Sequence, residues 1–213
     1  SGLMSYSNEN RGWYSGLTST GGVIPSGDFV FKSSVSGVFV GPRVAQLVQN
    51  QYFAGETLIS PGEDRNMTPW VRVTPPIEAS DPDAADVAEY MSYAMLAINP
   101  GATWVRNADW RDTSNPQAPV ISDRNTGSNA TGSVSSIWTR TDSGKWEGHV
   151  AFNDGQVLNR SDPVLDRTRY GSADEVSDDN LFADDDSSDS DEAAMTYSGD
   201  GTNAGDFSGQ GTP

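Results

Sequence analysis

The sequence predicts an α+β fold in which an N-terminal helix packs on an antiparallel β-sheet, with long loops and an acidic C-terminal tail. Three features predict this class. Residues 1–10 have the composition of a helix end, two short apolar runs at 89–98 and 118–122 have strand length, and residues 145–159 contain a hairpin signature.

The first element, residues 1–10, is expected to be helical. Its apolar side chains are Leu3, Met4 and Tyr6, and the segment then turns polar and reaches Gly12, a residue that commonly ends helices. A helix that began at residue 1 would have no N-cap. We therefore expect these residues to be the last turns of a longer helix.

A second, short helix is expected over residues 43–53, after a Gly- and Ser-rich loop at 13–27. Pro42 suits the first turn of a helix. Apolar side chains then recur at helical spacing, which predicts an amphipathic helix: Val44, Leu47, Val48 and Tyr52. The Pro- and Gly-containing segment 58–62 is expected to end this unit in a turn.

The sheet is expected to contain the two apolar runs and a hairpin. Asn153, Asp154 and Gly155 separate two extended runs, and Asp-Gly favours a hairpin turn because both residues tolerate a positive φ. Since a lone hairpin is unstable, we expect it to join 89–98 and 118–122 in one antiparallel sheet.

Charge divides the chain into a head, residues 1–171, and an acidic tail, residues 172–213. The tail holds 12 of the 30 acidic residues and none of the 13 basic ones, and the net charge is -17. Such a segment is expected to be solvated, mobile or held by cations. An acidic chain without a basic stripe repels phosphate backbones, so we expect no nucleic-acid partner.

Composition also restricts the chemistry. There is no cysteine and only one histidine, His149, which excludes thiolate chemistry and multi-histidine metal sites. His149 has no evident nucleophile partner, and Asp154 is expected to shape the turn. Acidic pairs such as Asp81 and Asp83 lie in predicted loops. We therefore expect no catalytic residues and no firm cofactor, and interpret the chain as a non-enzyme.

Two further interpretations, one for the acidic run and one for the tryptophans, remain open. Asp184, Asp186 and Asp189 could supply oxygen ligands to Ca²⁺, although the run lacks the spaced loop that preorganises a calcium site. Six tryptophans, several in predicted loops, could form a sugar-stacking surface or could pack over a small core: Trp13, Trp70, Trp104, Trp110, Trp138 and Trp146.

Several motifs, in a consistent order, resemble one family. Residues 3–14 resemble the end of the long helix in planctomycete-like prepilin-type proteins, where Tyr-Ala-Asn-Asp-Asn-x-Gly leads into the head. Residues 150–157 resemble the Val-Leu-Phe-Ala-Asp-Gly-x-Val signature of the prepilin-type processing-associated (His-x9-Asp-Gly) family. Residues 58–64 and 120–125 resemble its Leu-x-Cys-Pro-Ser-Asp and Val-Met-Ala-Asp-Arg stretches.

The sequence departs from that pattern at two motif positions. Gly144 stands where the signature histidine is expected, so the only candidate for it is the displaced His149, and Ser60 stands at the cysteine position. The resemblance extends over about residues 1–160, and the tail has no counterpart in it.

The resemblance implies a type IV pilin-like or pseudopilin architecture. The C-terminal half of a long N-terminal helix would pack on an antiparallel sheet, and the apolar first half, missing from this sequence, would anchor the precursor in the inner membrane. The implied function is a structural subunit of a type IV pilus-like or type II secretion-like filament, with other pilin-like subunits as partners. The head would lie in the periplasm or on the surface of the bacterial cell envelope. The alternative is a secreted or cell-surface binding module, for a glycan or another ligand, that uses the Trp-rich loops.

Overall fold

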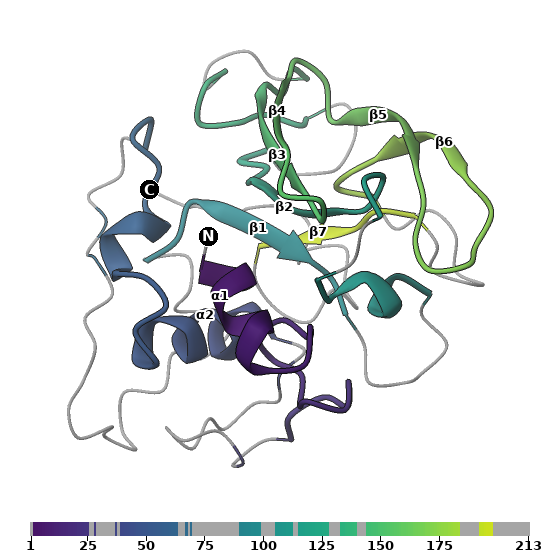
Figure 1. Cartoon of the computed structure of the whole chain (residues 1–213). Helices are drawn as coiled ribbons and strands as arrows, with labels where there is room; N and C mark the ends of the chain where they lie inside the picture. Colours follow the sequence, from purple (N-terminus) through teal and green to yellow (C-terminus); the bar gives the residue numbers. More distant parts are fainter. Residues whose placement is uncertain are drawn as a thin grey trace.

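The fold combines helices at the N-terminal side with a central antiparallel sheet and a smaller second sheet (Figure 1). The computed structural model describes residues 2–25, 28, 37, 39–63, 67, 69, 90–98, 105–112, 115–127, 133–139, 144–183 and 192–197. Mixed helix and antiparallel sheet confirm the predicted α+β class.

Helix α1 spans Gly2–Glu9, which confirms the helix predicted at the start of the chain. It ends in a Schellman motif, in which the N–H of Gly12 donates to the carbonyl of Ser7 at 2.8 Å. The prediction placed the stop at Gly12, and Gly12 does have a φ of 90°. However, the left-handed residue that ends the helix is Arg11, with a φ of 55°.

Helix α2 spans Val40–Gln49, so it begins and ends earlier than the predicted range 43–53. A helix is confirmed here and buries the predicted apolar residues Val44, Leu47 and Val48, but it is covered more fully than expected, with eight of its ten residues buried. The contacts of Arg43 show how a charged side chain is accommodated in this buried helix. Its guanidinium carbon lies 4.1 Å from the centroid of the Trp110 ring, and its Nη2 donates to the carbonyl of Leu96 at 2.9 Å.

The central sheet has the strand order β4-β3-β2-β1-β7 and is antiparallel throughout. Strands β1 (Tyr93–Leu96) and β2 (Pro119–Asp123) come from the two predicted apolar runs. Strands β3 (Gly148–Phe152) and β4 (Val157–Arg160) form the predicted hairpin. The prediction that these segments share one sheet is confirmed.

The two faces of this sheet differ in burial. Strand register and alternation place eight side chains on what we call the front face: Tyr93, Met95, Ile121, Asp123, His149, Ala151, Val157 and Asn159. The opposite face is buried, with residues such as Ala94, Leu96 and Val150 at 0% exposure. On the front face Met95 is 2% exposed but Val157 is 59% exposed. Elements packed on this face therefore cover only part of it.

The acidic segment contributes two strands that the sequence did not predict. A small hairpin pairs β5 (Val164–Thr168) with β6 (Val176–Asn180), and β7 (Met195–Thr196) pairs with β1 at the edge of the central sheet. Asp179 is 4% exposed and accepts hydrogen bonds from the hydroxyl of Thr168 and the N–H of Ala193. The segment expected to be a solvated tail thus supplies buried, hydrogen-bonded structure at residues 172–183 and 192–197, and residues 184–191 lie outside the described part of the chain.

Candidate functional site

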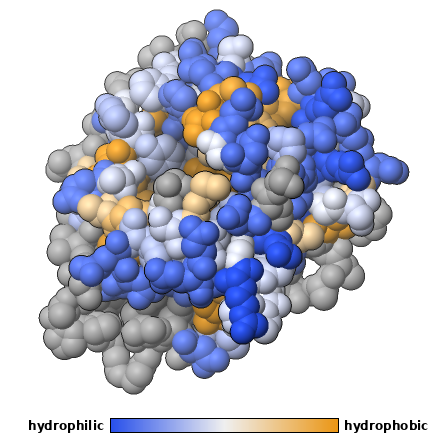
Figure 2. Space-filling view, viewed as in Figure 1, coloured by the Kyte–Doolittle hydropathy of each residue, from blue (hydrophilic) through white to orange (hydrophobic). Residues whose placement is uncertain are grey.

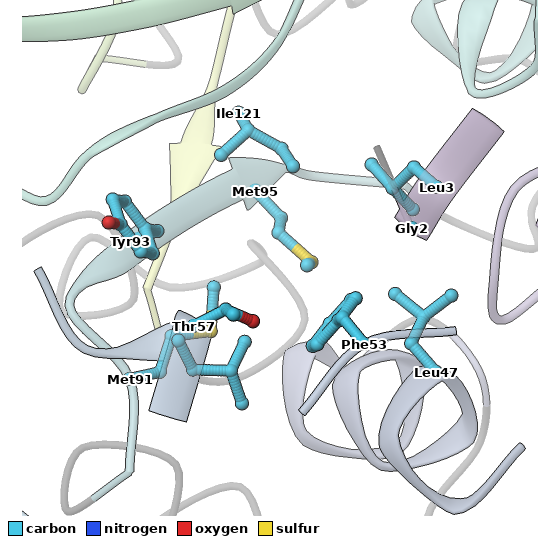
Figure 3. Close-up of a pocket in the computed structure, with 10 residues that line it drawn as sticks. Gly2, Leu3, Leu47, Phe53, Thr57, Met91, Tyr93, Met95 and Ile121 are labelled. Atoms are coloured by element: carbon cyan, nitrogen blue, oxygen red, sulfur yellow. The ribbon is translucent and has the colours of Figure 1, made fainter. Parts of the chain in front are cut away.

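An apolar pocket of about 410 Å³ lies between the helices and the front face of the central sheet (Figure 3). Its walls come from α1, from α2 and the residues after it, from the 3-10 helix η1 (Gly55–Leu58), and from β1 and β2. The lining residues are Gly2, Leu3, Leu47, Phe53, Thr57, Leu58, Met91, Tyr93, Met95 and Ile121.

The local sequence explains how the pocket forms at the start of α1. A Cβ atom on Gly2 would lie 2.2 Å from Cδ1 of Phe53, so only glycine lets the first turn of the helix rest on this ring. Leu3 follows it into the pocket wall. Met95 and Ile121 are register partners in neighbouring strands, so both side chains extend from the same face (Figure 3).

The pocket wall contains little polar chemistry. The hydroxyl of Thr57 donates to the carbonyl of Ala54 at 2.7 Å, and the hydroxyl of Tyr93 is hydrogen-bonded to Ser60. No residue of the lining carries a charge at neutral pH. A pocket of this kind favours an apolar side chain or ligand, and the phenol of Tyr93 is the one titratable group among the described residues of its lining. Figure 2 shows the surface of the molecule in the orientation of Figure 1, and this surface is largely hydrophilic with separate apolar areas.

A polar cluster occupies the other end of the front face. The buried carboxylate of Asp123, 1% exposed, accepts at Oδ2 from the indole N–H of Trp138 at 2.9 Å and from the backbone N–H of His149 at 2.8 Å. The imidazole Nδ1 of His149 lies 3.1 Å from the same oxygen. We call Trp138, Asp123, His149 and the adjacent Gly62 the Trp138 platform.

A second acidic residue lies nearby and is neutralised by an ion pair. Glu63 and Arg124, whose side chains are 1% and 3% exposed, form a salt bridge at 3.2 Å. Ser92 donates its hydroxyl to Glu63 at 3.0 Å.

Burial, followed by the charge of Asp123, raises the pKa of Tyr93. Tyr93 therefore stays a neutral phenol at physiological pH.

The predicted turn at residues 153–155 is present, but its geometry differs from the prediction. Gly155 alone has a positive φ, 84°, and Asp154 does not. The N–H of Gly155 donates to the carbonyl of Phe152, and the N–H of Phe152 donates to the carbonyl of Gln156, both at 2.9 Å. This is a three-residue loop with a bulge at glycine. Asp154 accepts from the N–H of Gln156 at 2.9 Å, so its side chain does support the turn.

Asn153 also has a second role, which its local sequence does not reveal. It is 1% exposed, accepts from the hydroxyl of Tyr14 at 2.9 Å, and donates to the carbonyl of Asp109 at 2.7 Å. Burial, with smaller contributions from Asp112 and Asp109, raises the pKa of Tyr14 well above its usual value. Tyr14 thus remains a hydrogen-bond donor, and the hairpin tip is fixed to two distant segments.

The weak metal candidates Asp184, Asp186 and Asp189 lie outside the described residues. Within the part of the chain that the structure describes, no group of three or more His, Cys, Asp or Glu side chains could hold a metal ion. Ca²⁺ binding by the acidic run therefore stays a prediction.

The tryptophans do not share one surface. Trp110 and Trp146 are 0% and 1% exposed, so these two rings pack in the core and do not form a sugar-stacking surface. Their indole N–H groups bond to the carbonyls of Ser15 and Arg124, which makes burial of these rings acceptable. Trp13 is half-buried beneath Arg111, and Trp138 is 44% exposed. Trp70 and Trp104 lie outside the described residues.

The pocket and the Trp138 platform were not predicted from sequence. Both join segments that are far apart in the chain, so no local spacing reveals them. One local pattern does point to this face of the sheet. Residues two apart in a strand lie on the same face, so Met95 and Ile121 provide apolar side chains beside the polar Asp123.

Comparisons of this chain with protein-family models, with curated proteins and with solved structures find no match. Among the helices in the described residues, none is both long and apolar enough to cross a membrane.

Proposed function

We propose that this chain is the head of a pilin-like or pseudopilin-like subunit and acts by assembly into a filament, not by catalysis. The observation that carries the proposal is the apolar pocket between the first turn of α1 and the front face of the sheet. Its wall includes Gly2 and Leu3, the first described residues of the chain. Further apolar helix before Gly2 would have an apolar surface to pack on.

The packing of α1 is consistent with this role. Leu3 and Tyr6 are 7% and 3% exposed and belong to the main hydrophobic core, so the helix is anchored in the head by its apolar side chains. Met4, in the same first turn, lies near the hairpin tip, where a Cβ on Gly155 would be 3.8 Å from its sulfur. A helix fixed in this way could transmit force from a filament core to the head.

In this proposal α1 is the last part of a longer helix. The upstream half would anchor the precursor in the inner membrane and later pack against other pilin-like subunits. Burial of apolar surface contributes about 25 cal/mol per Å², so the upstream helix would supply most of the assembly energy. The head would supply register and the outer surface of the filament, in the bacterial cell envelope.

The first test is the coding sequence upstream of Ser1. We expect roughly 30–50 further residues that include an apolar run of about 20, long enough to cross a bilayer. A cleavable signal peptide directly before the head, or no apolar run at all, would contradict the proposal.

The second test maps what lies over the pocket in the full-length gene product. The chain contains no cysteine, so Thr57→Cys places a benzophenone label at one exposed position on the pocket wall. In cells that produce the protein, we expect adducts with the upstream helix or with other pilin-like subunits, identified by mass spectrometry. Ser161→Cys, exposed between β4 and β5, is the matched control and should give fewer such adducts. Equal labelling from both positions would argue against assembly at the pocket.

A further inference from the structure

We propose that the exposed face of Trp138 is a stacking subsite for the ring of a neutral sugar. This inference does not depend on assembly into a filament, because it concerns the polar end of the front face and not the apolar pocket. It rests on how firmly the indole is held, on which of its faces is covered, and on the neutral polar groups beside it.

The indole is fixed at its pyrrole end. Its N–H donates to Asp123 at 2.9 Å, and that carboxylate is fixed in turn by two bonds from His149. The imidazole stands beside the indole with ring centroids 5.9 Å apart and an interplanar angle of 76°. Because this orientation exists before any ligand arrives, little side-chain entropy is lost on binding.

Gly62 covers one face of the indole, so the exposed surface of Trp138 belongs to the rest of the ring system. A Cβ on Gly62 would lie 2.8, 2.8 and 3.1 Å from three consecutive atoms of the six-membered ring. Near-equal distances to three consecutive atoms place Gly62 over the ring face and not at its edge. Since Trp138 is still 44% exposed, its accessible surface lies mainly on the opposite face and the outer rim. A flat aromatic surface with one open face suits the C–H face of a pyranose ring.

The groups beside the platform favour a neutral ligand with hydroxyl groups. With Nδ1 of His149 directed at Asp123, Nε2 is left on the outer side of a ring whose side chain is 49% exposed. Asn159, also exposed, is the register partner of His149 on β4. Both can bond to sugar hydroxyls. The net charge of -17 disfavours uronic acids and other anions. A quaternary ammonium ligand usually requires several aromatic walls, and here one open indole face is available among the described residues.

The test follows the indole N–H signals of the ¹⁵N-labelled 213-residue chain by NMR, with the Trp138 signal assigned from Trp138→Phe. The probes are the neutral oligosaccharides cellohexaose and hexa-N-acetylchitohexaose, with oligogalacturonate and choline as charged comparisons. We expect the Trp138 signal to shift with at least one neutral hexasaccharide at millimolar concentration, and not with the charged probes.

Variants then locate the site. Trp138→Ala should weaken the binding about tenfold or more, whereas Trp138→Phe, which keeps a smaller flat ring, should weaken it less. Val157→Ala changes another exposed residue on the same face and should bind like the parent protein. The wild-type shift, once assigned with Trp138→Phe, does not depend on Trp138→Ala, so the test holds even if that variant folds poorly.

Three outcomes would overturn the proposal. The first is no shift of the Trp138 signal with either neutral sugar. The second is a shift with choline alone, which would indicate a cation site. The third is unchanged affinity in a folded Trp138→Ala variant.

Discussion

At the scale of single residues, Asn153 shows how one buried amide joins parts of the chain that are distant in sequence. Its side chain bonds to Tyr14 and to the backbone of Asp109, and its own N–H donates to the carbonyl of Ala118 at 3.0 Å. These contacts link the N-terminal loop, the 3-10 helix η3 (Val105–Asp109) and the approach to β2 with the hairpin tip. Both the donor and the acceptor capacity of the amide are used.

We therefore expect Asn153→Ala to lower the free energy of unfolding by about 2–4 kcal/mol, since it leaves the Tyr14 hydroxyl and the Asp109 carbonyl buried without this partner. Urea unfolding followed by tryptophan fluorescence measures this. Asp154→Ala, in the same turn, removes one exposed hydrogen bond and should cost about 0.5 kcal/mol. Equal losses for the two variants would show that Asn153 acts only as a turn residue.

The sequence reveals the turn at 153–155 but not the network around it. Turn chemistry is local, so Asn-Asp-Gly between extended runs is enough to predict it. The partner Tyr14 lies 139 positions away, and nothing in either local sequence links the two residues. The same limit applies to the Trp138 platform, whose members Gly62 and Trp138 meet only in the folded chain.

At the scale of elements, the end of α1 carries a local conflict. The left-handed position that follows the helix is held by Arg11, an exposed side chain, while glycine is the residue best suited to that conformation. The neighbouring Gly12 has a positive φ as well, so two consecutive residues leave the ordinary backbone regions.

Two variants at this position should have opposite effects. Arg11→Gly should raise the free energy of unfolding by about 1 kcal/mol, because it removes the steric cost of the left-handed conformation. Gly12→Ala should lower it by about 1–2 kcal/mol, although the nearest atom to the added Cβ is 3.8 Å away, since the backbone angle alone opposes it. Thermal unfolding by circular dichroism compares the two. A stabilising Gly12→Ala would show that the helix ends differently.

Elements with a strong local signature were predictable, and those stabilised by distant partners were not. The central strands and the hairpin follow from apolar runs and turn residues. Strand β6 has the sequence Val-Ser-Asp-Asp-Asn, whose acidic composition indicates a solvated chain. It forms because Asp179 finds donors on Thr168 and Ala193, which no composition argument can supply.

At the scale of the whole molecule, β7, the last strand among the described residues, joins structure built from much earlier parts of the chain. β7 pairs with β1, Tyr197 donates its hydroxyl to the carbonyl of Met91 at 2.8 Å, and Arg106 donates to the carbonyl of Glu192 at 3.1 Å. Met195 and Tyr197 are 0% and 1% exposed. Residues 192–197 therefore belong to the hydrophobic core of the described structure.

A chain shortened to residues 1–183 should lose about 5 kcal/mol or more, because it gives up two large buried side chains and the partner of a buried arginine. Natural domains are stable by about 5–15 kcal/mol, so the shortened chain would lose most or all of its stability and be partly or largely unfolded. Urea unfolding and one-dimensional NMR test this. Tyr197→Phe, which removes a single hydrogen bond, is the control and should cost about 1 kcal/mol. A shortened chain that unfolds like the full one would mean that β7 is dispensable.

The pairing of β7 with β1 also has a consequence for biogenesis. Residues 195 and 196 leave the ribosome about a hundred residues after their partners Met95 and Leu96, so this edge of β1 stays open while those residues are synthesised. An open edge invites pairing with another nascent chain. A cell that makes this protein in quantity would benefit from a chaperone that covers this edge until β7 is synthesised, or from export of the chain before it folds.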